Sequence, residues 1–400
     1  MNILYYCDEY PPARNGGIGT VVKLVAEAMS QRGHNVIVAG RYWNGKGRKT
    51  VENINGVTVI RWQRRSYNSI ALIWRTLFAA KKNKHKRAQM VFSRTQKLLE
   101  KVIARYSVDL VEMPDYVDDF LYNYGIKTVP WKCSVPRVIR VHGSVSFLHH
   151  YLKGRPDDRK IKQDRDYFAL ADAVYAVSAF SKAYVSEYLC PWKDVEVIYN
   201  PIEEHWFKQS VKNEESQTIL FFGKIAKMKG VFSLIKAFNL VAADFPDAKL
   251  KLIGNGDVAK AQGLVDPRFS DRVVFAGFMP QERVMAEIDN SGFCVLPSYF
   301  ENFSMAALEV LARHKALIYT DRTSGRELIQ DGVDGLLVDP DNIEQIADGM
   351  RLLLKDIELR NRLADNGFEM CRNRFSTEIV IPEIESYYED VIKRCKDSRR

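Results

Sequence analysis

The 400 residues of this chain are more than one hydrophobic core usually organises, so we expect two domains. With 46% hydrophobic and 27% charged residues, the composition excludes a disordered chain. The net charge of +9 is local, because residues 61–106 hold thirteen basic side chains against a single acid, Glu100.

The beginning of the chain shows no secretion signal, since a predicted strand at Asn2–Tyr6 is followed by a polar loop from Asp8. The longest apolar run, Ile70–Ala80, is broken by Arg75 and is shorter than the ~20 residues of a membrane-spanning helix. The six cysteines stand singly, without metal-site spacing, which fits reduced thiols. We therefore expect a cytoplasmic protein, whose contact with a membrane would be peripheral and at the inner face.

Short β-branched runs alternate with segments of helical period, which predicts βα units and parallel sheets. The strands predicted in the first half are Asn2–Tyr6, Asn35–Ala39, Val57–Arg61, Asp109–Met113, Arg137–Val141, Ala173–Val177 and Glu196–Tyr199. The helices predicted there are Ile18–Gln31, one within Ser69–Tyr106, and Ser181–Leu189. The second half has predicted strands at Thr218–Phe222, Lys249–Ile253, Arg272–Phe275, Phe293–Leu296 and Ala316–Thr320. Its predicted helices are Val231–Ala243, Gln281–Asn290, Met305–Arg313, Ile343–Leu354, Glu358–Arg372 and Thr377–Lys393.

The alternation pauses at a polar stretch over residues 208–217 and restarts at the strand Thr218–Phe222. This predicts a Rossmann-like N-terminal domain over residues 1–205 and a second one over residues 206–375. Residues 376–400 are predicted to form a helix that packs back on the first domain. Sheets of this kind bind ligands at the carboxyl ends of their strands.

The most informative segment runs from Pro297 to Glu309, where a buried strand ends, a loop carries Glu301 and a helix begins. The free N–H groups at the start of a helix can receive an anion. Glu301 and Glu309 have the E-x7-E spacing of the retaining glycosyltransferases of family 4, and the segment resembles the family's E-G-F-G-x-x-x-x-E form. The resemblance implies that Glu309 binds the nucleotide ribose, and that Glu301 holds the sugar and diphosphate together with the main-chain amides that follow. These amides belong to Asn302, Phe303, Ser304 and Met305.

The resemblance also implies the GT-B fold, an α/β architecture of two facing Rossmann-like domains with parallel sheets and a cleft between them. Asn302 and Ser304 stand where the family has glycines, which would narrow the pocket around the donor sugar. In this family the leaving diphosphate itself takes the acceptor proton, on the face where the new bond forms. We expect the donor to be a UDP-sugar.

Residues 223–230, Gly-Lys-Ile-Ala-Lys-Met-Lys-Gly, follow a strand and resemble the family's G-R-L-x-x-x-K-G element. Fixed cations beside the phosphates stabilise the charge that develops on a departing nucleoside diphosphate. The resemblance implies that Gly223, Lys224 and Lys229 bind there. Lys224 replaces the family's arginine, keeping the charge without the bidentate fork. The alternative interpretation is a solvated basic turn.

Gly254 and Gly256 follow another predicted strand in a pattern close to a dinucleotide fingerprint. Such a site needs an acid near the end of the next strand, and Arg272–Phe275 is followed by none. We therefore interpret the two glycines as the family's G-x-G turn beside the donor nucleotide. Gly17 belongs to a glycine pair that opens the first helix, where the main chain can approach a ligand closely, as in the family's first-strand loop.

His142 ends a strand of the first half and resembles the family's position for a histidine near the donor sugar. The alternative is a structural histidine. Glu112 and Asp115 flank the end of another strand, and they could receive acceptor hydroxyls or belong to a solvated loop. Asp164-Arg165-Asp166 has the D-x-D form of a metal-binding motif but lies in a charged helical run. With cations and helix termini available for the diphosphate, we expect no metal and no other cofactor.

The basic residues of 61–106 are interleaved with apolar ones, a pattern typical of amphipathic helices that bind anionic membranes. This favours a lipid-linked acceptor, and the alternative is a solvated face whose apolar side lies in the core. We expect no nucleic-acid partner, because no recognised binding module accompanies the charge.

Together these features predict a retaining hexosyltransferase that acts on a glycan or lipid-linked glycan, in cell-surface polysaccharide biosynthesis. Two alternatives remain, a GT-B-fold nucleotide-sugar epimerase and a non-catalytic GT-B-like binding protein. Incubation of a nucleotide sugar without acceptor distinguishes an epimerase from a transferase, because an epimerase would interconvert sugars. Detectable turnover would exclude the second.

Overall fold

The computed structural model of the chain describes residues 1–12, 17–42, 49–63, 81–115, 133–207 and 216–398. It divides into two compact units, one formed by Met1–Pro201 with Val380–Arg400 and the other by Ile202–Ile379. The limits of these units lie a few residues from the predicted limits at 205 and 375. The C-terminal residues from Val380 belong to the first unit.

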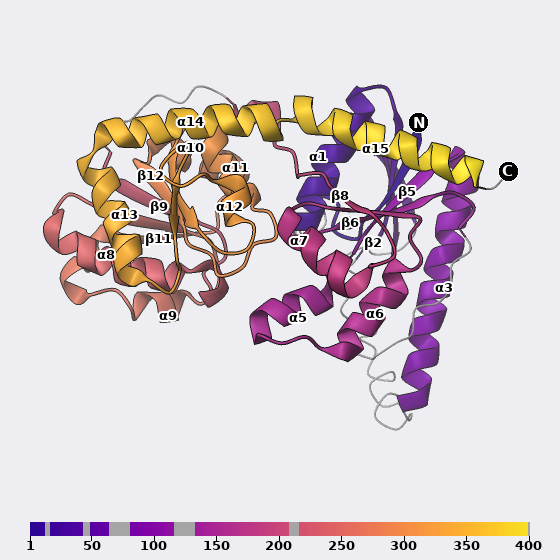
Figure 1. The fold of residues 1–400 in the computed structure, drawn as a ribbon, viewed down its shortest axis with the longest axis horizontal. Helices are drawn as coiled ribbons and strands as arrows, with labels where there is room; N and C mark the ends of the chain where they lie inside the picture. The colour runs from indigo at the N-terminus through magenta and orange to yellow at the C-terminus, as the bar shows by residue number, and fades with distance from the viewer. Residues whose placement is uncertain (13–16, 43–48, 64–80, 116–132, 208–215, 399–400) are drawn as a thin grey trace. The chain divides into compact units, whose positions relative to one another are not determined.

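In its described part, the first unit holds an eight-stranded sheet with the strand order β3-β4-β2-β1-β5-β6-β7-β8 (Figure 1). Only β3 and β4 pair in antiparallel fashion among these described strands. Strand β1 is buried along Ile3, Leu4 and Tyr5, as is typical of a parallel strand that is covered on both faces. The strands are β1 (Asn2–Tyr6), β2 (Asn35–Tyr42), β3 (Thr50–Ile54), β4 (Val57–Gln63), β5 (Leu110–Pro114), β6 (Arg137–Val141), β7 (Ala173–Ala176) and β8 (Val195–Val197).

Strand β3 is absent from the predicted strands, because its residues are mostly polar and exposed at the edge of the sheet. It turns into β4 through Asn55 and Gly56, whose φ angles are 50° and 84°. Two consecutive positive φ angles give a tight turn whose twist matches that of the flanking strands. The hairpin is therefore encoded by its turn rather than by an alternation of apolar residues.

Helices of the first unit cover this sheet, and the C-terminal helix is one of them. Its residue Tyr388 is buried and donates its hydroxyl hydrogen to Glu112 of β5. Glu385 of the same helix binds Arg32 at 2.6 Å and His34 at 2.7 Å. The helical elements are α1 (Gly17–Gln31), α3 (Lys81–Tyr106), α5 (Val145–Lys153), α6 (Asp158–Phe168), α7 (Ala179–Tyr184), the π-helix η1 (Val185–Leu189) and α15 (Thr377–Asp397).

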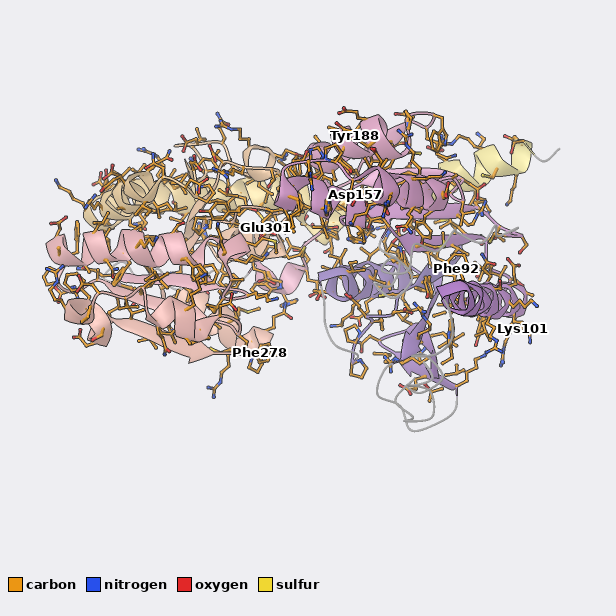
Figure 2. The ribbon with its side chains drawn as sticks, turned by 90° about the horizontal axis from the view of Figure 1, so that it is seen from below. Phe92, Lys101, Asp157, Tyr188, Phe278 and Glu301 are labelled. Atoms are coloured by element: carbon orange, nitrogen blue, oxygen red, sulfur yellow. The ribbon has the colours of Figure 1, made fainter. Side chains whose placement is uncertain are left out.

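Helix α3 contains the end of the basic segment. From Phe92 onward, its apolar residues Leu99, Val102 and Ile103 are buried, whereas Lys101 is exposed like the other basic residues along this stretch (Figure 2). The described end of the segment is thus a solvated basic face with its apolar side in the core. Residues 64–80 and the side chains of 81–91, on which the predicted membrane contact mainly depends, lie outside the described residues. Across the described ranges, every helix is too short or too polar to cross a membrane.

The described part of the second unit holds a six-stranded sheet in the order β11-β10-β9-β12-β13-β14, and its paired strands run parallel. The short strand β14 is the one that the sequence pattern did not predict. The strands are β9 (Thr218–Phe222), β10 (Lys249–Ile253), β11 (Val273–Gly277), β12 (Phe293–Leu296), β13 (Ala316–Thr320) and β14 (Leu336–Val338). The helical elements are η2 (Glu204–Trp206), η3 (Lys227–Lys229), α8 (Val231–Asp244), α9 (Val258–Gln262), η4 (Pro267–Arg272), α10 (Gln281–Asn290), α11 (Met305–Ala312), α12 (Gly325–Leu328), α13 (Ile343–Lys355) and α14 (Ile357–Phe375).

Candidate active site

The strand order of the second unit reverses beside β9, which pairs with β10 on one side and with β12 on the other. Open parallel sheets bind ligands outside the carboxyl ends of their strands, at such a switch point. The two loops that leave these carboxyl ends are residues 223–230 after β9 and residues 297–304 after β12. Both loops carry residues predicted to bind the donor.

Glycines bring the loops after β9 and β10 into main-chain contact. A Cβ atom on Gly254 would lie 1.8 Å from the carbonyl oxygen of Gly223, and one on Gly256 would lie 2.2 Å from that of Ile225. Gly223, Gly254 and Gly256 all have φ between 136° and 144°, where side chains are rarely tolerated. The three predicted glycines therefore shape this end of the sheet, and a larger residue at either later position would separate the loops.

A second close approach joins the turn η3 to the loop after β12. Gly230, with φ of 71°, lies so near the carbonyl oxygen of Pro297 that a Cβ atom would be 1.8 Å from it. The N–H of Tyr299 donates to the carbonyl oxygen of Met228 at 2.8 Å. These contacts fix Lys229, the last residue of η3, beside the loop that carries Glu301.

Glu301 (labelled in Figure 2) is the centre of this arrangement. Lys229 donates from Nζ to Oε1 of Glu301 at 2.6 Å, and Ser298 donates from Oγ to the same oxygen at 3.0 Å. No described residue forms a hydrogen bond with Oε2, so that oxygen can accept one from a ligand. Lys224 is exposed and forms no ion pair with the described residues, so its charge is also available.

The loop after Glu301 leads into helix α11. Ser304 is the N-cap residue, and its Oγ accepts the N–H of Ala307 at 3.2 Å. Asn302, Phe303 and Ser304 are buried, whereas Met305 at the start of the helix is half-buried. N–H groups in the first turn of a helix have no partner within the helix, and the helix dipole favours a negative charge beside them.

Glu309 lies inside α11 and is half-buried. Burial is the largest cause that raises the pKa of its carboxyl group to about 8; a hydrogen bond with Gln281 opposes this shift, and the charge of Glu203 adds to it less strongly. The carboxyl group is therefore protonated below this pH in the ligand-free protein. Neither Gln281 nor Glu203 was predicted from the sequence, because both reach Glu309 from distant parts of the chain.

In the first unit, His142 follows β6 and is held by its main chain. The N–H groups of His142 and Gly143 each donate to a different carboxylate oxygen of Asp115, both at 2.9 Å. Burial and, less strongly, the positive charge of Arg140 lower the pKa of His142 to about 3. Its Nε2 is buried and has no hydrogen-bond partner among the described residues. His142 is thus a neutral imidazole with one ring nitrogen available.

The structure corrects the interpretation of Glu112 as a group that receives acceptor hydroxyls. Glu112 is buried in the core, where Tyr175 donates to its Oε2 at 2.6 Å, Tyr388 donates to the same oxygen, and Arg140 lies 3.6 Å from its Oε1. Asp115 is also fully buried, and both of its oxygens accept the main-chain N–H groups described above. Burial raises the pKa of Asp115 to about 7. Both carboxyl groups are therefore occupied by contacts within the first unit.

Two further predicted positions lie in the first unit. Gly17 is exposed at the start of α1, and a Cβ atom there would meet no other atom, unlike one on Gly19, which would lie 2.2 Å from the carbonyl oxygen of Glu9. Asp164, from the D-x-D sequence, is buried and accepts the N–H of Ser146 at 2.8 Å, whereas Asp166 is exposed. Within the described ranges, no group of three or more acidic, histidine or cysteine side chains is arranged to hold a metal ion.

Comparison with known proteins gives matches along almost the whole chain. The family model of glycosyl transferases group 1 matches residues 202–370, and that of glycosyltransferase family 4 matches residues 15–206. An uncharacterized glycosyltransferase of Methanocaldococcus jannaschii is 27% identical, over 97% of this chain and 98% of that protein.

Solved structures resemble the chain in fold. Sucrose-phosphate synthase of Thermosynechococcus elongatus matches with a TM-score of 0.78 and 19% identity, over 98% of this chain and 99% of that one. HepE of Anabaena, in complex with UDP and glucose, matches with a TM-score of 0.69 and 15% identity, over 97% and 99% of the two chains. These likenesses confirm the predicted fold class of two Rossmann-like α/β domains with parallel sheets.

Proposed function

We propose that this chain, which belongs to the glycosyltransferases of group 1 and family 4, is a retaining transferase that moves a sugar from a UDP-sugar to a glycan or lipid-linked glycan. The observation that carries the proposal is the pair of Lys229 and Glu301, 2.6 Å apart at the switch point of the second unit. A nucleotide sugar joins an anionic diphosphate to a hydroxyl-rich ring, and this pair offers a cation beside a carboxylate with one open oxygen.

The diphosphate is assigned to Lys224, Lys229 and the N–H groups that open α11. Negative charge grows on the diphosphate as the sugar departs, so fixed cations stabilise the transition state more than the ground state. These groups supply the positive charge that a divalent metal would otherwise provide. We therefore expect transfer to continue when divalent metals are removed with a chelator.

The ribose is assigned to Glu309, as the family resemblance implies. Ribose hydroxyls are hydrogen-bond donors, and the ionised form of the carboxyl group accepts them more strongly than the protonated form does. Gln281, which contacts Glu309, lies at the start of α10 and can orient it. Uracil is proposed as the base because HepE, which shares this fold, was solved with UDP.

Transfer breaks the bond between the anomeric carbon and the phosphate oxygen, and it forms a bond from the same carbon to an acceptor oxygen on the same face. The acceptor proton moves to the departing phosphate oxygen, so no enzyme carboxylate needs to accept it. Glu301 Oε2 accepts a hydrogen bond from a sugar hydroxyl. His142, which is neutral at physiological pH, is assigned a hydrogen bond to the donor sugar rather than a role in proton transfer.

An aromatic cluster in the first unit supports a glycan acceptor. Neighbouring rings of α5, α7 and η1 have centroids 4.7–6.3 Å apart, and Tyr151 among them is 40% exposed. An exposed aromatic face with a polar hydroxyl can pack against a sugar ring and bind its hydroxyls. The members of the cluster are Phe147, His150, Tyr151, Phe180, Tyr184 and Tyr188. As part of this proposal, the acceptor belongs to a cell-surface polysaccharide. Such a glycan is made at the inner face of a membrane.

The test is a transfer assay with a panel of nucleotide sugars, glycans and lipid-linked glycans, in the presence of a chelator. We expect transfer with retention at the anomeric carbon, and loss of about 10²–10³ in kcat for Lys229→Ala, as for removal of one charge-stabilising group from an active site. The matched control is Lys236→Ala, which removes an exposed lysine of α8 and should leave kcat unchanged.

Three outcomes would contradict the proposal. Full activity in Lys229→Ala would exclude the assigned diphosphate site. Interconversion of nucleotide sugars without acceptor would identify an epimerase. Dependence on a divalent metal would show that the cations of Lys224 and Lys229 do not suffice.

A further inference from the structure

The loop after β13 holds a residue in a rarely used backbone conformation. Thr323 has φ of 56°, a left-handed conformation that a β-branched residue adopts only when its surroundings impose it. Strain of this kind occurs most often at functional sites, where the rest of the structure maintains it. The contacts of Thr323 and its neighbour identify what the strained conformation supports.

Thr323 and Ser324 hold the main chain of Glu301 from both sides. The N–H of Glu301 donates to Oγ1 of Thr323 at 3.2 Å, and Oγ of Ser324 donates to the carbonyl oxygen of Glu301 at 3.2 Å. Ser324 is the N-cap residue of α12, yet its side chain does not cap that helix. Serine is favoured at N-caps because its hydroxyl usually accepts an N–H of the first turn. Here the hydroxyl of a buried serine is used for Glu301 instead.

The side chain of Glu301 is fixed at one end by other residues. Lys229 and Ser298 both donate to Oε1, which leaves Oε2 as the oxygen without a described hydrogen-bond partner. The loop after β13 therefore holds the N–H and the carbonyl oxygen of Glu301, while η3 and the loop after β12 hold Oε1. When these three points are fixed, the direction of Oε2 is fixed as well.

We propose that Thr323 and Ser324 are positioning residues that direct Oε2 of Glu301 toward a hydroxyl of the donor sugar. This proposal rests on the proposed function, because that function assigns Glu301 to the sugar. The diphosphate and the ribose are bound by other groups. The clamp, meaning Thr323 and Ser324 together, therefore sets the affinity for the sugar part of the donor and leaves the affinity for UDP almost unchanged.

Three substitutions of Thr323 separate its hydrogen bond from its shape and its strain. Thr323→Val keeps the branched shape and removes the acceptor, whereas Thr323→Ser keeps the acceptor. Thr323→Gly also removes the acceptor, but it relieves the left-handed strain, so its unfolding temperature should equal or exceed that of the natural protein. Thr218→Val is the matched control, because the hydroxyl of Thr218 forms no hydrogen bond with the described residues.

The measurement is calorimetric titration of the natural protein with UDP, UDP-glucose, UDP-galactose and UDP-N-acetylglucosamine. The UDP-sugar that it binds most tightly is then titrated into the variants, beside UDP. We expect Thr323→Val and Thr323→Gly to weaken binding of that UDP-sugar about tenfold, the effect of one lost hydrogen bond, while UDP binding changes by less than about twofold. Thr323→Ser should restore the sugar affinity. A purely structural role of Thr323 would alter both affinities together or neither.

The results distinguish failure of the clamp from failure of the donor site. Equal losses of UDP and UDP-sugar affinity in Thr323→Val, or full sugar affinity in the stable Thr323→Gly variant, would overturn the clamp and leave the donor site intact. If the natural protein binds UDP, and no attached sugar increases its affinity, the assignment of Oε2 would be overturned. A natural protein that binds none of the four probes would overturn the proposed function and the clamp with it.

Discussion

The acidic residues near the carboxyl ends of parallel strands have opposite environments in the two units. In the first unit, both carboxylate oxygens of Glu112 and both of Asp115 are engaged by groups of the same unit. In the second unit, Lys229 and Ser298 share one oxygen of Glu301 and leave the other open, and Glu309 is half-buried with a hydrogen bond to the amide of Gln281. A carboxylate at a strand end is therefore a candidate ligand-binding group only if the fold leaves part of its hydrogen-bonding capacity unused.

The largest expected effect tests the conclusion that Glu112 of the first unit has a structural role. Glu112→Ala removes the partner of the buried Arg140 and of two tyrosine hydroxyls, including that of Tyr388 in the C-terminal helix. We expect a loss of about 3–5 kcal/mol in the free energy of unfolding, because a buried charge is left without compensation. Chemical denaturation measures it, and Glu389→Ala, an exposed position on α15, is the control. A stable Glu112→Ala variant that loses acceptor affinity would instead restore the original interpretation.

A smaller effect concerns Glu309, whose folded-state pKa is about 8 against an ordinary value of 4.5. A raised carboxyl pKa contributes stability below pH 4.5, and this contribution is lost as the pH rises through about 8. At pH 9, the free energy of unfolding of Glu309→Gln should therefore be higher than that of the natural protein, by on the order of 3 kcal/mol. Thermal unfolding at pH 5 and pH 9 checks the sign, and a difference that does not grow with pH would contradict it.

The same group predicts a pH-dependent donor affinity. UDP-glucose has no phosphate ionisation near neutrality, so a titration between pH 6 and pH 8 reports on the protein. If Glu309 must ionise to accept ribose hydroxyls, affinity should rise up to about tenfold for each pH unit below its pKa. Glu309→Gln should bind more weakly at pH 8 and lose this pH dependence. An unchanged pH profile in the variant would remove Glu309 from the ribose site.

The sequence predicts much of the fold because its signals are local. Strands such as Phe293–Leu296 are short apolar runs, and the helix at Met305 begins after a serine that does cap it. The sequence does not predict strand β3 because its mostly exposed residues show no regular alternation of apolar and polar side chains, and it does not predict β14 because three residues carry too little pattern. Helix α5, which begins at Val145 soon after His142, is also missing from the prediction.

The candidate site, like the fold, has features that the sequence predicts and contacts that it does not. Lys229 and Glu301 could be paired through a family pattern, and the structure brings them within hydrogen-bonding distance. The partners that give each group its chemistry come from elsewhere in the chain, as Thr323 does for Glu301 and Tyr388 for Glu112. Such contacts depend on how distant segments pack, and no local spacing encodes them.

The smallest expected effect concerns His142, whose pKa lies near 3 because of burial and the charge of Arg140. The folded protein keeps this imidazole neutral, so the associated stability is present above pH 6.5 and is lost as the pH falls toward 3. His142→Gln should therefore lose less stability than the natural protein between pH 6 and pH 4, and its kcat/KM should fall only about tenfold, the value of one hydrogen bond. The shape of the pH–rate profile near pH 6.5 should not change. A profile whose ionisation near pH 6.5 disappears in His142→Gln would mean that this histidine titrates during catalysis, and that the first unit supplies a proton-transfer group after all.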